Sequence, residues 1–289
     1  MVLAALAGCG GDDDPGGTPE AETPSASSSP SASTGDTGDV AALLKAALQP
    51  LVDHPVIDFR HDVYSGQALA VETKGRAFQQ AGWQSTTTSP KVLGSPDAPS
   101  GDEIKGRMDV RAVDADLYMQ LSTWKKPLAG CWLRTSQGQV PGGQLAMTPG
   151  VPGYVTLLGA IRPQAVVAQD GAKTVVGADV PLRIGLQLLT TGVLGLLQLD
   201  ASQLEGASVP LGVQLTDGVL TDVELQGGDL VSAVRAAGGD VTPDAEATLG
   251  QLRITVGYKP GPSDAPQVKA PAADLVLTNA DVKADRGCG

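Results

Sequence analysis

The feature that most limits what this chain can fold into is its hydrophobic period. From Val56 onward, apolar and polar side chains alternate along short segments that glycine or aspartate separates. A period of two is typical of strands with one buried and one solvated face. We therefore expect an antiparallel sheet, whose first strands are FRHDVYSG, LAVETKGRAF, WQSTTTS, EIKGRMDVRAV, DLYMQLS and CWLRTS.

The alternation also predicts which side chains share a face of that sheet. Along EIKGRMDVRAVDADLYMQL the charged residues fall on one face, because successive side chains of a strand point to opposite sides. The opposite face carries the apolar residues Ile104, Met108, Val110, Leu117 and Met119.

The same period returns later in the chain. We expect further strands in KTVVGADVPLRIGL, VPLGVQLTDGVLTDVELQG and ATLGQLRITVGYKP. Asp217-Gly218 in the second segment predicts a two-residue hairpin, because these residue types accept the positive φ of a type I′ turn.

Helical patterns are fewer. DVAALLKAALQPLV begins at Asp39, which can serve as N-cap, and we expect it to end at His54-Pro55. YVTLLGA and GDLVSAVRAAGG are predicted as short helices, 137–153 as a Gly/Pro-rich loop, and APQVKAPAADLVL as an extended C-terminal tail. The sum is an α+β fold in which helices cover one face of a large curved sheet.

The N-terminus carries a second constraint. Leu6-Ala7-Gly8-Cys9 matches the bacterial lipobox, in which small residues precede a cysteine that takes a diacylglyceryl group. We expect Cys9 to carry lipid, with acyl chains such as palmitate; a free thiol in a disordered tail is the alternative. Residues 1–8 are then a signal-peptide remnant, and since Met1–Ala7 has no positive charge, we expect the true leader to be longer.

Residues 9–38 are expected to link that anchor to a single domain at 39–289. From residue 10 to 38 the chain holds no Leu, Ile, Val or aromatic residue, so burial cannot offset its conformational entropy. Such a disordered tether has a root-mean-square reach of roughly 30 Å. The sequence has no apolar run of the length that a transmembrane helix needs. We therefore place the protein, as a monomer, on the outer face of the cytoplasmic membrane, held by the lipid on Cys9.

The net charge of the chain limits the kinds of partner that it can bind. The chain has 20 Lys and Arg against 32 Asp and Glu, a formal net charge of −12. Long-range repulsion of this sign disfavours nucleic acid and anionic lipid headgroups.

Once Cys9 is assigned to lipid, Cys131 and Cys288 remain as an even pair. Export would place them in an oxidising space, where we expect a disulfide that pins the C-terminal tail to the strand carrying Trp132. Two unpaired thiols are the alternative.

No catalytic or metal-binding set can be named. His54 and His61 are the only histidines, and their spacing of seven is not one of metal ligands. No serine stands in a G-x-S-x-G context, and turn chemistry explains Asp114 and Asp116. We therefore expect neither a cofactor, nor a metal, nor an enzyme.

LRIGLQLLTTGVLGLLQL, residues 182–199, is more apolar than a one-sided sheet requires. It is either an ordinary core segment or part of the lining of a lipid cavity.

The order of these elements resembles the actinobacterial LppX/LprA/LprF/LprG lipoprotein family, which is similar to the LolA/LolB-like lipid carriers. The resemblance is carried by Leu6-Ala7-Gly8-Cys9, the helix from Val40, ADLYMQLSTWKKP at 115–127 and VPLGVQLTDGVLTDVELQG. It spans most of 39–260; the loop at 137–153, the tail beyond 260 and the Cys131/Cys288 pair have no counterpart in it.

The resemblance implies a half-barrel sheet whose concave face is closed by helices around an apolar cavity. The cavity would hold the acyl chains of a membrane lipid or glycolipid, which a membrane transporter could deliver or receive. Its predicted lining is Leu182, Ile184, Leu186, Leu189, Val193, Leu196, Leu199, Val110 and Met108. The alternative hypothesis is a non-enzymatic surface lipoprotein that scaffolds or senses a protein partner and binds no lipid.

Overall fold

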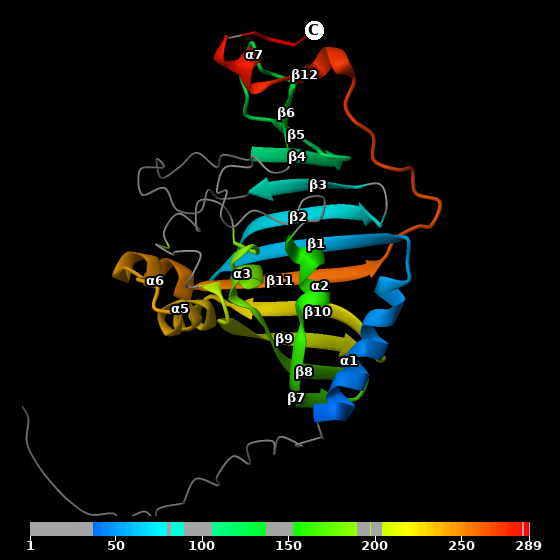
Figure 1. The fold of residues 1–289 in the computed structure, drawn as a ribbon, viewed down its shortest axis with the longest axis vertical. Coiled ribbons are helices and arrows are strands. Elements are labelled where there is room, and N and C mark those ends of the chain that lie inside the picture. Colours follow the sequence, from blue (N-terminus) through cyan, green and yellow to red (C-terminus); the bar gives the residue numbers. More distant parts are fainter. Residues whose placement is uncertain are drawn as a thin grey trace, which may run out of the picture. The chain divides into compact units, whose positions relative to one another are not determined.

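The fold is dominated by one open sheet of 12 strands (Figure 1). The computed structural model describes residues 37–79, 82–89, 106–136, 153–189, 197, 204–284 and 286–288, all within one compact unit. The strand order is β12-β6-β5-β4-β3-β2-β1-β11-β10-β9-β8-β7. Neighbouring strands are antiparallel, except that β12 runs parallel to β6.

The first half of the sheet is a meander, as the period of two predicts. Its strands are β1 (Val56–Ser65), β2 (Ala68–Phe78), β3 (Gly82–Ser89), β4 (Gly106–Val113), β5 (Asp116–Leu121) and β6 (Trp132–Ser136). The second half consists of β7 (Arg162–Asp170), β8 (Lys173–Pro181), β9 (Ser208–Thr216), β10 (Val219–Gln226) and β11 (Leu252–Pro260), and β12 (Val276–Leu277) completes the sheet at the other edge. Pairing of β1 with β11 joins the two halves.

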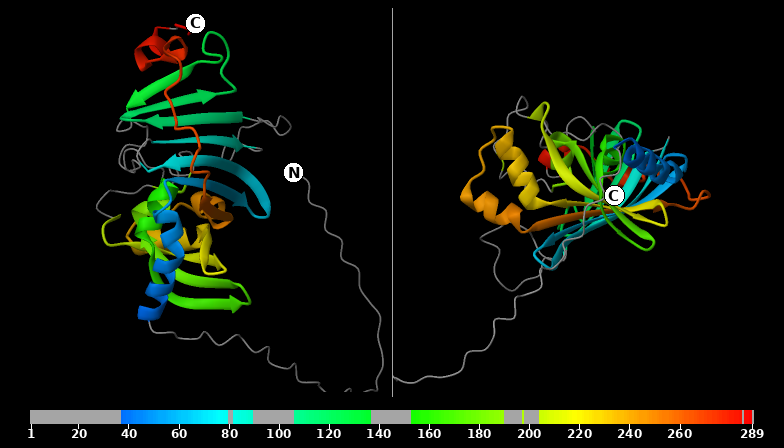
Figure 2. Two further views of the ribbon diagram at one scale, coloured as in Figure 1. Left: turned by 90° about the vertical axis from the view of Figure 1, so that its right-hand side faces the viewer. Right: turned by 90° about the horizontal axis from the view of Figure 1, so that it is seen from below.

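The helices are short, apart from the first. They are α1 (Thr37–Val52), α2 (Gly153–Ala160), α3 (Leu182–Leu186), α5 (Gly227–Ala236), α6 (Pro243–Gly250), α7 (Asn279–Lys283) and the 3₁₀ turn η3 (Ala273–Leu275). Contacts of α1, α2, α3 and α5 with the sheet concentrate on β7–β11. Figure 2 shows α1 and α2 on one side of the sheet. Within the described residues, no helix combines the length and apolarity that a bilayer crossing requires.

The core lies between these helices and the sheet. Strands β9 and β11 bury every second side chain on the helix side, and Val213, Ile254 and Val256 are fully enclosed. The entry helix α1 contributes apolar residues at helical spacing: Val40, Leu44, Ala47 and Leu51. The predicted fold class, an α+β arrangement with helices on one face of a large antiparallel sheet, is therefore confirmed.

The hairpin between β9 and β10 is also confirmed. Asp217 and Gly218 have φ values of 52° and 74°, the pair of positive angles that a type I′ turn requires.

Three segments before the C-terminal tail differ from the prediction. Residues 182–186 were expected to continue a strand, but β8 ends at Pro181 and these residues form α3. Residues 247–250 were expected to be strand, but they complete α6, and β11 begins at Leu252. The helix has clear start signals: the Thr242 side chain accepts a hydrogen bond from the Ala245 backbone N–H, and Pro243 occupies the first turn. The residues after Pro163 in β7 form an additional strand at the sheet edge.

The C-terminal tail is extended over residues 261–272, which we call the C-terminal strap. Val268 of the strap packs on Val56 and Phe78, and Arg111 of β4 donates a hydrogen bond to the Lys269 carbonyl at 3.2 Å. Within the predicted extended tail, 265–277, the prediction is wrong for residues 273–275, which form η3, whereas 276–277 form the strand β12. Helix α7 follows the predicted tail. The start of helix α7 is stabilised by a capping box, in which the side chains of Thr278 and Asp281 accept hydrogen bonds from each other's backbone N–H groups.

The predicted disulfide is present. Cys131, next to β6, is bonded to Cys288, with 5.7 Å between their Cα atoms. The bond holds the end of the chain against the strand that carries Trp132, as expected.

Candidate functional site

The predicted site residues fall into three groups. Cys9, Val193, Leu196 and Leu199 lie outside the described residues. Leu182, Ile184, Leu186 and Leu189 lie in α3 and the turn after it, and all four are buried. Val110 is buried on β4, and Met108 is half-buried beside it.

The structure brings the described members of this set into one apolar cluster. Leu182 and Leu186 are fully enclosed, and α3 is packed against α2, α5, β8 and β9. Val110 belongs to the same cluster, and Met108 is packed against it. The described part of 182–199 is therefore an integral part of the hydrophobic core.

The apolar face of the sheet continues past β7–β11, the strands on which the contacts of α1, α2, α3 and α5 concentrate. The cross-strand register places Met108, Val110, Leu117 and Met119 on the face that also carries Phe59 of β1. We call these four residues of β4 and β5 the apolar extension. Met108 and Met119 are only partly buried, and methionine adapts its shape to varied apolar partners.

A buried histidine lies on the same face. The His61 side chain is 7% exposed and forms a hydrogen bond with the backbone of Leu188, in the turn after α3. Burial lowers the pKa of His61 to about 4, against which the Leu188 hydrogen bond acts weakly. The imidazole is therefore neutral near pH 7 and ties β1 to the helical layer.

His54 has a local role. Its Nδ1 lies 2.7 Å from the Val56 carbonyl oxygen, where α1 leads into β1. Among the described residues, no group of His, Cys, Asp and Glu side chains is arranged to hold a metal ion.

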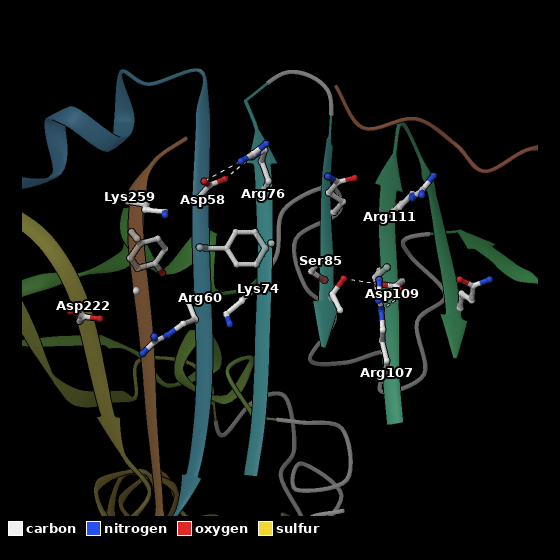
Figure 3. A pocket seen from close by; sticks show the side chains of 18 of the residues that line it. Asp58, Arg60, Lys74, Arg76, Ser85, Arg107, Asp109, Arg111, Asp222 and Lys259 are labelled. Atoms are coloured by element: carbon white, nitrogen blue, oxygen red, sulfur yellow. Dashed lines mark hydrogen bonds and ion pairs between the residues drawn. The ribbon is translucent and has the colours of Figure 1, made fainter. Parts of the chain in front are cut away.

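The opposite face of the sheet is polar, and it holds a large pocket. Figure 3 shows the pocket, which has a volume of about 1180 Å³ and which we call the trough. It crosses the strands from β10, which contributes Asp222, to β6, which contributes Trp132. Seven inter-strand spacings of about 4.8 Å each give it a length of roughly 34 Å.

Gly257 keeps the floor of the trough open. A Cβ atom at this position would lie 3.1 Å from Asp222 Oδ1 and would also touch Arg60. A larger residue would therefore push these two side chains apart.

The register sets the order of the polar side chains in the trough. One row across the strands consists of Lys259, Asp58, Arg76, Gln84 and Arg111. The adjacent row runs from Asp222 past Gly257 to Arg60, Lys74, Thr86, Asp109 and Gln120.

Several cations of the trough are held by carboxylates. Arg76 binds both oxygens of Asp58, at 2.6 and 3.1 Å, and Arg107 binds Asp109 at 2.9 Å. The hydrogen bonds that Arg76 donates to the Asp58 carboxylate raise the pKa of Arg76. Such two-point contacts fix the direction of the guanidinium groups.

Arg60 and Lys74 are paired with carboxylates of their own strands. Arg60 lies 2.8 Å from Asp62 and Lys74 lies 2.7 Å from Glu72, yet both cations remain more than half exposed. Asp62 is 2% exposed, and its burial raises its pKa, although Arg60 opposes that shift.

Two cations of the trough, Arg111 and Lys259, differ from the other four. Neither Arg111 nor Lys259 forms an ion pair with a carboxylate among the described residues. The Arg111 guanidinium is stacked 4.6 Å from the centre of the Trp132 ring and is held by the strap carbonyl of Lys269.

The sequence prediction did not identify the trough. Its cations come from β1, β2, β4 and β11, so no basic run exists in the sequence. The available signal was local: in KGR at 74–76 and RMDVR at 107–111, basic residues are two or four positions apart and therefore share a face.

Comparison with known proteins gives structural matches only. No family model matches the sequence, and no curated protein does. Among solved structures, the Mycobacterium tuberculosis lipoprotein LppX is 10% identical, with 77% of this chain and 94% of that chain covered and a TM-score of 0.38. LprF from Mycobacterium bovis is 9% identical, with 80% and 97% covered and a TM-score of 0.41.

A LolA superfamily protein from Nitrosomonas europaea is 10% identical, with 76% of this chain and 91% of that chain covered and a TM-score of 0.25. The comparison thus returns the same group of proteins that the sequence resembles. At these identities and TM-scores, functional proposals rest on the residues of this chain.

Proposed function

We propose that this protein is a membrane-anchored extracytoplasmic lipoprotein that binds the acyl chains of a lipid or glycolipid and carries or presents them. The observation that carries the proposal is the apolar extension. Apolar side chains of β4 and β5 continue the core face past β7–β11, the strands on which the contacts of α1, α2, α3 and α5 concentrate. Acyl chains are flexible and purely apolar, so they match a surface of this kind.

The two half-buried methionines identify the part of that surface most accessible to a ligand. Met108 and Met119 pack against the core with one side, and each keeps part of its side chain accessible. The burial of each CH₂ group contributes about 0.8 kcal/mol, so one long acyl chain supplies enough free energy for stable binding.

Lipid attached to Cys9 would hold the protein at the membrane, which is the source of the proposed lipid ligand. At least two acyl chains on one cysteine give stable anchoring, whereas one chain gives only reversible attachment. The tether at 9–38 would then allow the domain to turn toward the bilayer. Neither step requires catalysis, a cofactor or a metal.

Mass spectrometry tests the proposal directly. The chain with Cys9→Ala is exported by an actinobacterial host, purified without detergent and extracted with organic solvent. We expect a stoichiometric lipid with two or three acyl chains. A folded protein that yields no lipid would contradict the proposal.

A pair of tryptophan variants tests where the ligand lies. Met108→Trp fills space on the apolar extension and should reduce bound lipid well below one per protein. Thr88→Trp is the matched control, because Thr88 lies on the neighbouring strand but on the polar face, where it is exposed. Equal lipid content in both folded variants would exclude the apolar extension as the binding surface.

The second candidate is a non-enzymatic lipoprotein that scaffolds or senses a protein partner. The complete burial of Leu182 and Leu186 favours it, because α3 is packed as in an ordinary core. This candidate predicts a lipid-free protein in the extraction.

A further inference from the structure

The strongest feature that acyl-chain binding leaves unexplained is the trough on the polar face. Its lining includes six cations and three carboxylates, a formal charge of +3. The whole chain has 20 cations and 32 carboxylates. Even when Asp62 and Glu72, which pair with Arg60 and Lys74 from outside the lining, are counted, the trough keeps a net positive charge on an otherwise acidic protein.

We propose that the trough binds a short soluble ligand that carries phosphate groups along a hydroxyl-rich chain, as a phosphorylated oligosaccharide does. The site lies on the opposite face from the apolar extension, so the inference does not depend on the proposed function.

The cations account for the phosphate groups. Four of the six are arginines, whose planar fork matches two phosphate oxygens at once. Arg76 and Arg107 are already aimed by their bidentate carboxylates, so little side-chain entropy would be lost on binding. Arg111 and Lys259, which form no ion pair among the described residues, can neutralise a ligand charge without losing a carboxylate partner.

The remaining polar groups account for the hydroxyls. Gln84, Thr86 and Gln120 offer amide and hydroxyl groups along the same rows, and Thr221 adds a hydroxyl next to Asp222. The Asp222 carboxylate can accept hydrogen bonds from sugar hydroxyls. The groups follow one another across seven strands, so an elongated ligand meets more of them than a compact one does.

The charge of the rest of the protein limits the length of the ligand. Electrostatic attraction acts within a Debye length of about 8 Å at physiological ionic strength. A polyanion that extended beyond the trough would meet the acidic surface that gives the chain its net charge of −12. A short ligand avoids that repulsion.

A soluble ligand fits the trough better than a bilayer surface does. The large apolar side chains that are exposed among the described residues are Val52, Val167 and Leu275, and none of them lines the trough. The apolar residues that do line it, Phe59, Val110, Trp132 and Tyr258, are all buried. The trough therefore offers no exposed apolar side chain for insertion into a membrane, and a flat headgroup layer cannot enter a recessed surface.

The test compares two ligands that differ only in phosphate. Maltotriose phosphorylated at both ends and unmodified maltotriose are titrated into the full chain with Cys9→Ala by isothermal titration calorimetry. We expect binding of the phosphorylated sugar only, and an affinity that weakens as salt is added. Equal binding of both sugars, or no binding of the phosphorylated one, would overturn the proposal.

A matched pair of triple variants localises the site. Lys74→Gln, Arg111→Gln and Lys259→Gln together remove three cations of the trough and should weaken binding about tenfold or more. Lys45→Gln, Lys125→Gln and Lys173→Gln remove the same charge from residues outside the trough and should change binding little. Equal weakening by both sets would show diffuse attraction and no site.

A fallback variant and a membrane-binding assay ensure that every result either supports or contradicts the proposed phosphate site. If the triple variant fails to fold, Lys259→Gln alone replaces it, because that side chain is exposed. Vesicles of phosphatidylglycerol test whether the trough binds a membrane instead. If the protein binds these vesicles through the trough cations and does not bind the phosphorylated sugar, the proposal of a soluble ligand is wrong and the trough is a membrane-binding surface. Lipid content of the trough variants stays at the wild-type level, so failure of this proposal is distinguishable from failure of acyl-chain binding.

Discussion

Protonation of His61 should make the fold sensitive to mild acid. The imidazole is buried between β1 and the turn after α3, and burial lowers its pKa from 6.5 to about 4. The unfolded chain takes up a proton near pH 6.5, whereas the folded chain does not until about pH 4. The free energy of unfolding therefore falls as the pH decreases through this window.

The magnitude follows from the two pKa values. One pKa unit corresponds to 1.36 kcal/mol, so the shift amounts to about 3 kcal/mol of stability, present above pH 6.5 and lost by about pH 4. Asp62 acts in the opposite sense, because its raised pKa means that the folded state binds a proton more readily than the unfolded state. A comparison with a variant is therefore needed to isolate His61.

His61→Gln provides that comparison, because glutamine keeps an N–H donor for the Leu188 backbone and does not titrate. Guanidinium chloride denaturation of both proteins at pH 7.5, 6.5, 5.5 and 4.5 measures the difference in unfolding free energy. We expect wild type to lose stability relative to the variant at each step below 6.5. A difference that stays constant across this range would refute the burial argument.

Three further predictions concern stability and are checked by the same denaturation assay. Cys288→Ser opens a loop of 157 residues and should cost up to about 5 kcal/mol, with loss of hydrogen-exchange protection in β12 and α7. Gly218→Val should cost about 1–2 kcal/mol, because its φ of 74° is unfavourable for a residue with a Cβ, whereas an unchanged midpoint would argue against the type I′ turn. Asp58→Asn should cost about 1–2 kcal/mol, because Arg76 loses a charged partner in a contact that is less than one-third exposed.

The strands could be predicted from the sequence because their signal is local. Alternation in RMDVRAV and the Asp217-Gly218 turn each depend on a few neighbouring residues, and both have the expected structure. The order of the strands could not be predicted. Strand β1 pairs with β11, about 200 residues away, and local alternation carries no information on which distant strand becomes the neighbour.

The errors also have local causes. ATLGQLRITVGYKP was predicted as one strand, but the Thr242 cap and Pro243 stabilise a helix that ends before β11 begins. The C-terminal tail contains the capping signal Thr278–Asp281, which the many prolines before it obscured.

The candidate site was harder to predict, since it depends on register. Lys259, Asp58 and Arg76 become neighbours only when β11, β1 and β2 pair in one particular alignment. The sequence shows that these residues share a face with other polar residues, but it cannot show which strands stand side by side. The same limit applies to the apolar extension, whose residues were predicted to share a face, whereas its position past β7–β11 was not predicted.

Strand β4 shows why the two proposed surfaces are linked in folding and separate in binding. It alternates Arg107, Asp109 and Arg111 on the trough with Met108 and Val110 on the apolar face. A slip of one residue would move the charged side chains into the core, so the register is strongly specified. Substitutions that keep the alternation can change one surface without moving the other, because neighbouring side chains point to opposite sides of the same backbone. A loss of phosphate binding and a loss of lipid should therefore occur together only in variants that disturb the strand itself.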